Sequence, residues 1–371
     1  MMNFGSIPLR NKALFFCNAL FFFAYSVSAQ IPNAYYNSAF GKKEKVLKTA
    51  LYDIVKDHNS LSYGDLWSAF ADTDKKSNGK VWDMYSDIPD ATPPYQYTFF
   101  DNQCGNYKNE GDCYNREHSF PKSWFNDGYP MYTDLFHLYP TDGKVNGERG
   151  NYPFGEVNSP AWTSRNGSKR GSNSTSGYNK TVFEPINAYK GDFARSYFYM
   201  VTRYENVITT WTSSEAKETL AGNTYPAFKQ WAIDLLLKWH RQDPVSQKET
   251  DRNNAVYQYQ HNRNPYIDYP QLAEYVWGDS ITYAFNPDKP TAIEMIALEL
   301  EPVVYSLFGA IYVENITTAS TIRIYNTVGQ LIHRTQISKE NYICDFPKNQ
   351  FYIVQISDIQ GNIKTIKVIN H

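Results

Sequence analysis

Apolar residues recur at intervals of three and four in several stretches of the first three quarters of the chain, which is the spacing of one helical face. Residues 42–58 are predicted to form such a helix, because these apolar positions share a face: Val46, Leu47, Leu51, Ile54 and Val55. We expect further helices over 63–71, 184–204 and 227–239. Between them, 73–115 and 155–180 are rich in polar residues and glycine. The first is expected to hold loops with short strands, and the second a mobile surface loop.

Short alternating runs of apolar and polar residues, typical of strands, replace the helical pattern near the end of the chain. They cover Thr321–Tyr325, Gln330–Thr335, Phe351–Ile356 and Lys364–Ile369. Turn residues separate them at 326–329 and 360–362. This pattern predicts a small antiparallel β-sandwich. The 371-residue chain is therefore expected to have an α+β fold, with a mainly helical domain over 30–302 and the sandwich over 303–371.

Residues 1–29 have the composition of a secretory signal peptide. Arg10 and Lys12 supply the positive start, and the apolar run 13–25 follows. The tripeptide 27–29 (Val-Ser-Ala) then provides a cleavage site. Because the apolar run is too short to span a bilayer, we expect a soluble, exported chain.

Export to an oxidising compartment determines how the cysteines are interpreted. Cys104 and Cys113 lie close together in the sequence and are expected to form a local disulfide. Cys17 belongs to the signal peptide. Cys344 is left single and is expected to be a buried, inert thiol.

The composition, with 42% hydrophobic and 20% charged residues, predicts a folded globule. The formal net charge of −2 does not by itself favour a polyanionic ligand. Residues 143–195, however, contain eight Lys and Arg against four Asp and Glu. Such a local excess can form a basic face that attracts a polyanion, although a solvated face of mixed charge would give the same count.

The candidate chemistry lies in the adjacent pair Glu117 and His118 and in Asn146. Phosphodiester hydrolysis needs a base that takes a proton from water, and histidine does this near neutral pH. It also needs a hard divalent cation, which one or two oxygen ligands can hold. Neighbouring side chains of a strand point opposite ways, so Glu117 and His118 can serve the metal and the water separately. Taken singly, such a histidine is usually structural, and an Asn-Gly pair is usually a turn.

Several short blocks around these residues occur in a set order: 113–118 (Cys-Tyr-Asn-Arg-Glu-His), 138–140 (Leu-Tyr-Pro), 145–147 (Val-Asn-Gly), 149–152 (Arg-Gly-Asn-Tyr), 183–185 (Phe-Glu-Pro) and 262–265 (Asn-Arg-Asn-Pro). Together they make residues 95–277 resemble the bacterial endonuclease I family, a branch of the ββα-metal nucleases. The resemblance implies a strand–loop–strand–helix core, with His118 ending the first strand and Asn146 on the helix. It implies His118 as the general base and Glu117 and Asn146 as ligands of Mg²⁺, or of another divalent cation such as Mn²⁺ or Ca²⁺. It also implies cleavage of DNA, and often RNA, with little sequence preference and with 5′-phosphate products.

Residues beside this motif are weaker candidates. Phe136 stands where many relatives carry histidine, so His137 is expected to have a structural role in orienting the loop that carries the base. Arg149 is a candidate for contact with the scissile phosphate, and an ion pair with Glu148, Glu156 or Asp134 is the equal alternative. Further cations are candidates for binding the nucleic-acid backbone, namely Arg116, Lys144, Lys190 and Arg195. Arg195 can alternatively join its own helix to the core.

The last 60 to 70 residues resemble the C-terminal sorting domain of the type IX secretion system, on the segments 322–330, 351–356 and 364–369. This resemblance implies the secretion machinery as a partner, with release or attachment at the cell surface. An accessory β-domain without a sorting role is the alternative.

The sequence therefore predicts a secreted or surface-bound, monomeric endonuclease that acts on DNA and RNA. Two other functions stay open: a surface nucleic-acid-binding or adhesion module without catalysis, and a phosphodiesterase for a smaller phosphate ester. An open basic groove would favour the polymer and an enclosed pocket the small ester.

Overall fold

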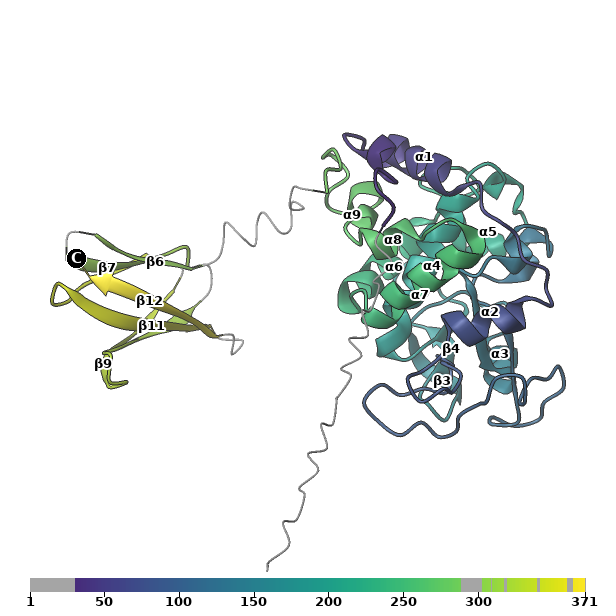
Figure 1. Ribbon diagram of the computed structural model, residues 1–371, viewed down its shortest axis with the longest axis horizontal. Coiled ribbons are helices and arrows are strands. Elements are labelled where there is room, and N and C mark those ends of the chain that lie inside the picture. Colours follow the sequence, from purple (N-terminus) through teal and green to yellow (C-terminus); the bar gives the residue numbers. More distant parts are fainter. Residues whose placement is uncertain are drawn as a thin grey trace, which may run out of the picture.

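The computed structural model describes residues 31–287, 302–307, 309–316, 319–338, 341–358 and 363–370. The signal peptide predicted over 1–29 and the turn predicted at 360–362 lie outside these residues. Helices and antiparallel sheets occur together, which confirms the α+β class (Figure 1). Within the described ranges, no helix has both the length and the apolar character that crossing a membrane requires.

Helices are the main regular structure between residues 31 and 287. The α-helices are α1 (Glu44–Val55), α2 (Leu66–Thr73), α3 (Gly143–Arg149), α4 (Lys190–Arg203), α5 (Ala216–Thr219), α6 (Gln230–Gln242), α7 (Gln247–Gln260), α8 (Pro265–Asp268) and α9 (Leu272–Val276). Short 3-10 helices are η1 (Asn37–Ala39), η2 (Lys122–Phe125), η3 (Met131–Thr133), η4 (Asn187–Tyr189) and η5 (Ile208–Thr210). The four helices predicted from the apolar spacing are confirmed as α1, α2, α4 and α6.

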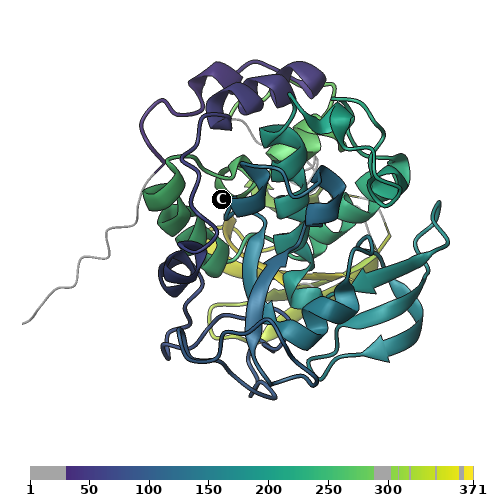
Figure 2. The same ribbon diagram turned by 90° about the vertical axis from the view of Figure 1, so that its right-hand side faces the viewer.

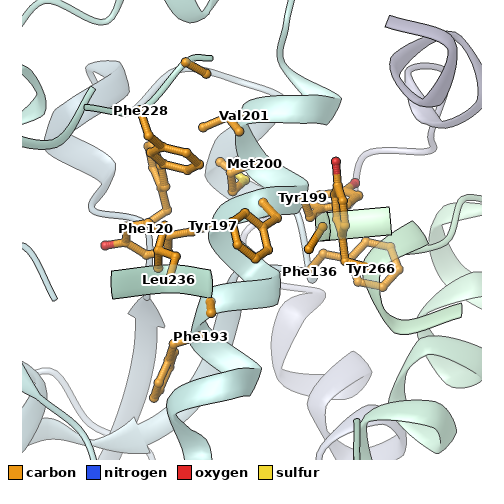
Figure 3. Packing of buried hydrophobic residues seen from close by; sticks show 14 of the residues in the cluster. Phe120, Phe136, Phe193, Tyr197, Tyr199, Met200, Val201, Phe228, Leu236 and Tyr266 are labelled. Carbon is orange, nitrogen blue, oxygen red and sulfur yellow. The ribbon is translucent and has the colours of Figure 1, made fainter. Parts of the chain in front are cut away.

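Helix α4 lies at the centre of the hydrophobic core, and all of its residues are buried. Side chains from distant segments pack around it, as Figure 3 shows. Phe120 meets Tyr197 with ring centroids 5.0 Å apart, and Phe136 meets Tyr199 at 4.7 Å. Both phenylalanines come from the segment that carries the candidate catalytic residues, so this packing fixes that segment to the core.

Two antiparallel sheets lie between residues 114 and 184. Strand β1 (Tyr114–His118) pairs with β2 (Leu138–Asp142), and α3 follows β2 directly. A second sheet has the order β3-β4-β5, drawn in teal in Figure 2, with β3 at Val157–Thr163, β4 at Lys169–Asn173 and β5 at Thr181–Glu184.

The prediction of a mobile loop over 155–180 is wrong, because β3 and β4 lie within it. These strands are held by backbone pairing, and most of their side chains are partly or fully exposed. Gly171 shows how closely the backbones approach, since a Cβ there would lie 2.2 Å from the carbonyl oxygen of Ser159. Polar side chains on both faces remove the alternation that identifies a strand in a sequence.

Strands are the only regular structure in the described residues of the C-terminal segment. Its strands are β6 (Val303–Leu307), β7 (Ala310–Glu314), β8 (Ser320–Tyr325), β9 (Leu331–Ile337), β10 (Tyr342–Asp345), β11 (Gln350–Asp358) and β12 (Ile363–Asn370). They form sheets of order β10-β7-β6 and β12-β11-β8-β9. A hydrophobic cluster unites residues of both sheets, among them Ile311, Ile322, Ile324, Val354 and Ile356. The four predicted strands are confirmed as β8, β9, β11 and β12.

The expected disulfide between Cys104 and Cys113 is present and closes the loop that leads into β1. Cys344 is free within the part of the chain that the structure describes. It lies on β10 and is half-buried, whereas a fully buried thiol was expected.

Candidate active site

The β1–β2 hairpin and α3 bring the motif residues together. In the hairpin, Glu117 pairs with Tyr139 and His118 with Leu138. Asp142 ends β2 and caps α3, because its side chain accepts a hydrogen bond from the backbone N–H of Val145 at 2.8 Å. The chain therefore turns from the strand into the helix without a loop.

A side-chain hydrogen bond joins the helix back to the first strand. Nδ2 of Asn146 on α3 donates to Oδ1 of Asn115 on β1 at 2.7 Å. Side chains alternate along a strand, so Asn115 and Glu117 share one face of β1, while Arg116 and His118 share the other. The bond thus places the amide of Asn146 on the face that carries Glu117.

Glu117 is a buried carboxylate with two partners on one oxygen. The hydroxyl of Tyr85 donates to Oε1 at 2.9 Å, and Nε of Arg149 lies 3.4 Å from the same oxygen. Burial raises the pKa of Glu117, while the charge of Arg149 and the Tyr85 hydrogen bond act in the opposite direction. No described residue forms a hydrogen bond with Oε2. This oxygen remains as the acceptor that Glu117 can offer to a ligand.

His118 is a buried, neutral imidazole with a fixed tautomer. Nε2 lies 3.1 Å from the carbonyl oxygen of Tyr132, and a carbonyl can only accept, so Nε2 carries the proton. The rings of His118 and Tyr132 are stacked with centroids 5.0 Å apart. Burial, and secondarily the nearby His137, lowers the pKa of His118 well below its usual value. Nδ1 is therefore unprotonated at neutral pH and can accept a proton, as a general base requires.

Two side chains of the candidate site, Glu117 and Asn146, have oxygen atoms that can bind a divalent cation. Among the described residues, no group of three or more His, Cys, Asp and Glu side chains could hold a metal ion. The hydrogen bonds of Glu117 and Asn146 described above use Oε1 and Nδ2. Oε2 of Glu117 and Oδ1 of Asn146 are therefore two oxygen atoms that can coordinate a cation. Mg²⁺ is commonly bound by one or two protein oxygens with water completing its shell, so the donor set fits this ion.

Arg149 is buried beneath the end of β1, with 1% of its surface exposed. Nη1 donates to the carbonyl oxygens of His118 at 3.2 Å and Gly150 at 3.0 Å, and Nη2 donates to that of Ser119. The guanidinium therefore contacts both candidate residues, the carboxylate of Glu117 and the backbone carbonyl of His118. The acidic partner of Arg149 is Glu117, which was not among the three acids considered from the sequence.

The other predicted cations are paired with protein groups. Nη1 of Arg116 donates to the carbonyl oxygen of Tyr63 at 2.6 Å, and the guanidinium lies 3.5 Å from the centroid of the Tyr63 ring. Lys144 pairs with Glu148 and Lys190 with Glu184, each at 2.6 Å. These three cations therefore already have partners within the protein.

Arg195 and His137 are both buried. Arg195 forms a two-point ion pair with Glu249, including Nη2 to Oε2 at 2.8 Å, which joins α4 to α7. Nε2 of His137 lies 2.7 Å from the carbonyl oxygen of Met131, and its ring centroid lies 5.6 Å from that of His118. Burial lowers the pKa of His137 to about 4.

Sequence reasoning assigned no role to three residues that hold the site. Asn115 could have been found, because strand alternation puts it two positions from Glu117 on the same face. Tyr85 lies in a loop 32 residues before its partner Glu117 and has no local sequence signal. The same is true of Tyr132, which acts on His118 through a backbone carbonyl that any residue could provide.

Comparison with known proteins shows that the chain is similar to nucleases. The family model described as Endonuclease I matches residues 44–271. An extracellular ribonuclease of Bacillus amyloliquefaciens is 35% identical over 249 residues, which cover 66% of this chain and 78% of that protein. An extracellular ribonuclease of Bacillus subtilis (strain 168) is 33% identical over 250 residues, with the same coverage. A periplasmic deoxyribonuclease of Aeromonas hydrophila is 28% identical over 138 residues, which cover 37% of this chain and 48% of that protein.

Proposed function

Since this chain belongs to the endonuclease I family, and is therefore an endonuclease, we propose that it is a secreted, metal-dependent enzyme that cleaves both DNA and RNA with little sequence preference. The similarity to extracellular ribonucleases and to a periplasmic deoxyribonuclease supports both the location and the two substrates. The β1–β2–α3 arrangement supports a ββα-metal core.

The observation that carries the mechanism is the hydrogen bond between Nε2 of His118 and the carbonyl oxygen of Tyr132. It leaves Nδ1 of a neutral imidazole as the proton acceptor. In the proposed reaction, Nδ1 takes a proton from water as the water oxygen bonds to phosphorus. The bond between phosphorus and the 3′ oxygen breaks, and this oxygen takes a proton from solvent water, which yields a 3′-hydroxyl on one product and a 5′-phosphate on the other. His118 then releases its proton to solvent.

Oε2 of Glu117 and Oδ1 of Asn146 would hold the divalent cation, Mg²⁺ in the first instance. When bound, such an ion offsets negative charge on the phosphate oxygens. Tyr85 and Arg149 hold the Glu117 carboxylate from the protein side, and Asn115 orients the amide of Asn146. Because the guanidinium of Arg149 is engaged with protein groups, we assign it to positioning Glu117 and the end of β1.

Export is the second part of the proposal. We infer a signal peptide over residues 1–29, a nuclease domain over 30–302 and a sorting domain over 303–371. The C-terminal strands support this division because they form two sheets with a hydrophobic cluster of their own. A β-sandwich that is read by the type IX secretion machinery fits this organisation.

Digestion of plasmid DNA and of RNA by the purified chain, with Mg²⁺ or with EDTA, tests the function. We expect both polymers to be cut only with Mg²⁺, and the products to accept a ligase without prior phosphorylation because they carry 5′-phosphates. Intact nucleic acid in every arm, with a folded protein, would instead favour a binding module or a smaller phosphate ester. Cleavage that persists in EDTA would contradict the metal requirement.

A further inference from the structure

A cleft of about 670 Å³ borders the helix that carries Asn146. Its lining includes Gly147 of α3 and Gly150, the residue that caps the C-terminus of this helix. Gly147 follows Asn146 in the chain, and the backbone N–H of Gly150 donates to the carbonyl oxygen of Asn146 at 2.9 Å. The cleft therefore adjoins the end of the helix that carries the proposed metal ligand Asn146, and its volume is in the range of small-molecule sites.

Two tyrosine rings line this cleft. The ring of Tyr178 is stacked on Trp231, with centroids 4.5 Å apart and planes only 9° from parallel. Tyr152 also lines the cleft, and 38% of its surface is exposed. A flat ring held from behind is the arrangement on which nucleic-acid bases stack in single-strand binding proteins.

The charges in the cleft do not suit a phosphate group. Its lining includes Glu215, Glu218 and Lys180, and the lysine is already paired with Glu218 at 2.5 Å. Two carboxylates against one neutralised cation would repel an anion. Carboxylate oxygens instead accept hydrogen bonds from the amino groups of bases, as Glu and Asp do from cytosine.

We propose that this cleft binds one unpaired nucleobase of the substrate beside the scissile phosphate, with Tyr178 and Tyr152 as stacking partners and Glu215 and Glu218 as acceptors for base N–H groups. The inference rests on the proposed nuclease function and adds a preference for single-stranded stretches. In a duplex, the base faces are covered by stacked neighbours and the donor groups are used in pairing, so neither could reach the cleft.

Fluorescence anisotropy with labelled single-stranded hexanucleotides, in EDTA to prevent turnover, tests the proposal on the full chain. RNA and DNA probes form separate arms, and each is also made with one abasic residue at every position in turn. Tyr178→Ala and Tyr152→Ala are each expected to raise Kd about tenfold for the intact probe, since stacking of one base contributes on that order. One abasic probe should bind wild type as weakly as the variants bind the intact probe.

Two further variants make the result decisive. Glu215→Gln alters an exposed side chain of the cleft without touching the Tyr178–Trp231 stack, so it stays informative even if Tyr178→Ala does not fold. Tyr283→Ala removes an exposed tyrosine outside the cleft and should leave Kd unchanged. Wild-type affinity in Tyr152→Ala and Glu215→Gln, or equal affinity for all abasic probes, would overturn the subsite. Cleavage of RNA and DNA by wild type with Mg²⁺, measured in parallel, separates that outcome from failure of the nuclease function.

Discussion

Replacing Tyr85 with phenylalanine removes a single oxygen that donates to Oε1 of Glu117 at 2.9 Å. Both side chains are buried, so water cannot easily replace the lost donor. A hydrogen bond to a charged group contributes about 1.5–3 kcal/mol, which corresponds to roughly 1–2 pKa units. The bond favours the charged carboxylate, and burial already raises the pKa of Glu117. We therefore expect Tyr85→Phe to raise that pKa further.

The acid limb of the kcat/KM profile should then move upward by about 1–2 pH units, and half-maximal cleavage near neutral pH should need more Mg²⁺. Initial rates of oligonucleotide cleavage between pH 4.5 and 9, at several Mg²⁺ concentrations, measure both effects. Tyr36→Phe is the matched control, because Tyr36 is also buried and donates to a carboxylate, Asp268, at 2.6 Å. A Tyr85→Phe profile that overlays wild type, or equal shifts in both variants, would refute the reasoning.

Three other perturbations test separate parts of the account. Asn115→Ala removes the acceptor for Nδ2 of Asn146, so the Mg²⁺ concentration for half-maximal cleavage should rise about 10- to 100-fold; a change in thermal stability alone would contradict this. Burial, and secondarily the charge of Asp142, raises the pKa of Asp83 to about 8. The stability that Asp83 contributes is therefore complete below its unfolded pKa of about 4 and is lost as the pH rises through 8. Asp83→Asn should flatten that fall in the free energy of unfolding, measured by urea titration between pH 4 and 8, and an unchanged slope would exclude Asp83 as its source. Deleting the residues after Pro302 should leave cleavage intact and stop export, and retained export would refute the sorting proposal.

The sequence was most informative where one periodicity dominates. Helices α1 and α6 were predicted because their apolar, buried residues recur at helical spacing, and β8 and β11 because buried and partly exposed positions alternate. Strands β3 and β4 were missed because backbone pairing holds them, with little burial to leave a pattern.

The candidate site also has some residues that the sequence revealed and some contacts that it did not. Glu117 and His118 are adjacent in sequence, and the hairpin register and the Asn115–Asn146 bond explain how Asn146 reaches them. The partner of Arg195 could not be predicted, because Glu249 lies 54 residues away in the sequence and meets Arg195 only in the folded chain, where it joins α4 to α7. For the same reason, a local count of charges over residues 143–195 could not reveal that Arg149 and Arg195 are buried.

Single-turnover cleavage by His118→Ala, with and without added imidazole, tests the general-base assignment most directly. His261→Asn is the control, since His261 is exposed and its left-handed backbone (φ 60°) is one that asparagine adopts readily. We predict that His118→Ala folds normally, cleaves about 100- to 10,000-fold more slowly and regains part of its rate with imidazole, while His261→Asn cleaves like wild type. A wild-type cleavage rate in folded His118→Ala would contradict the account.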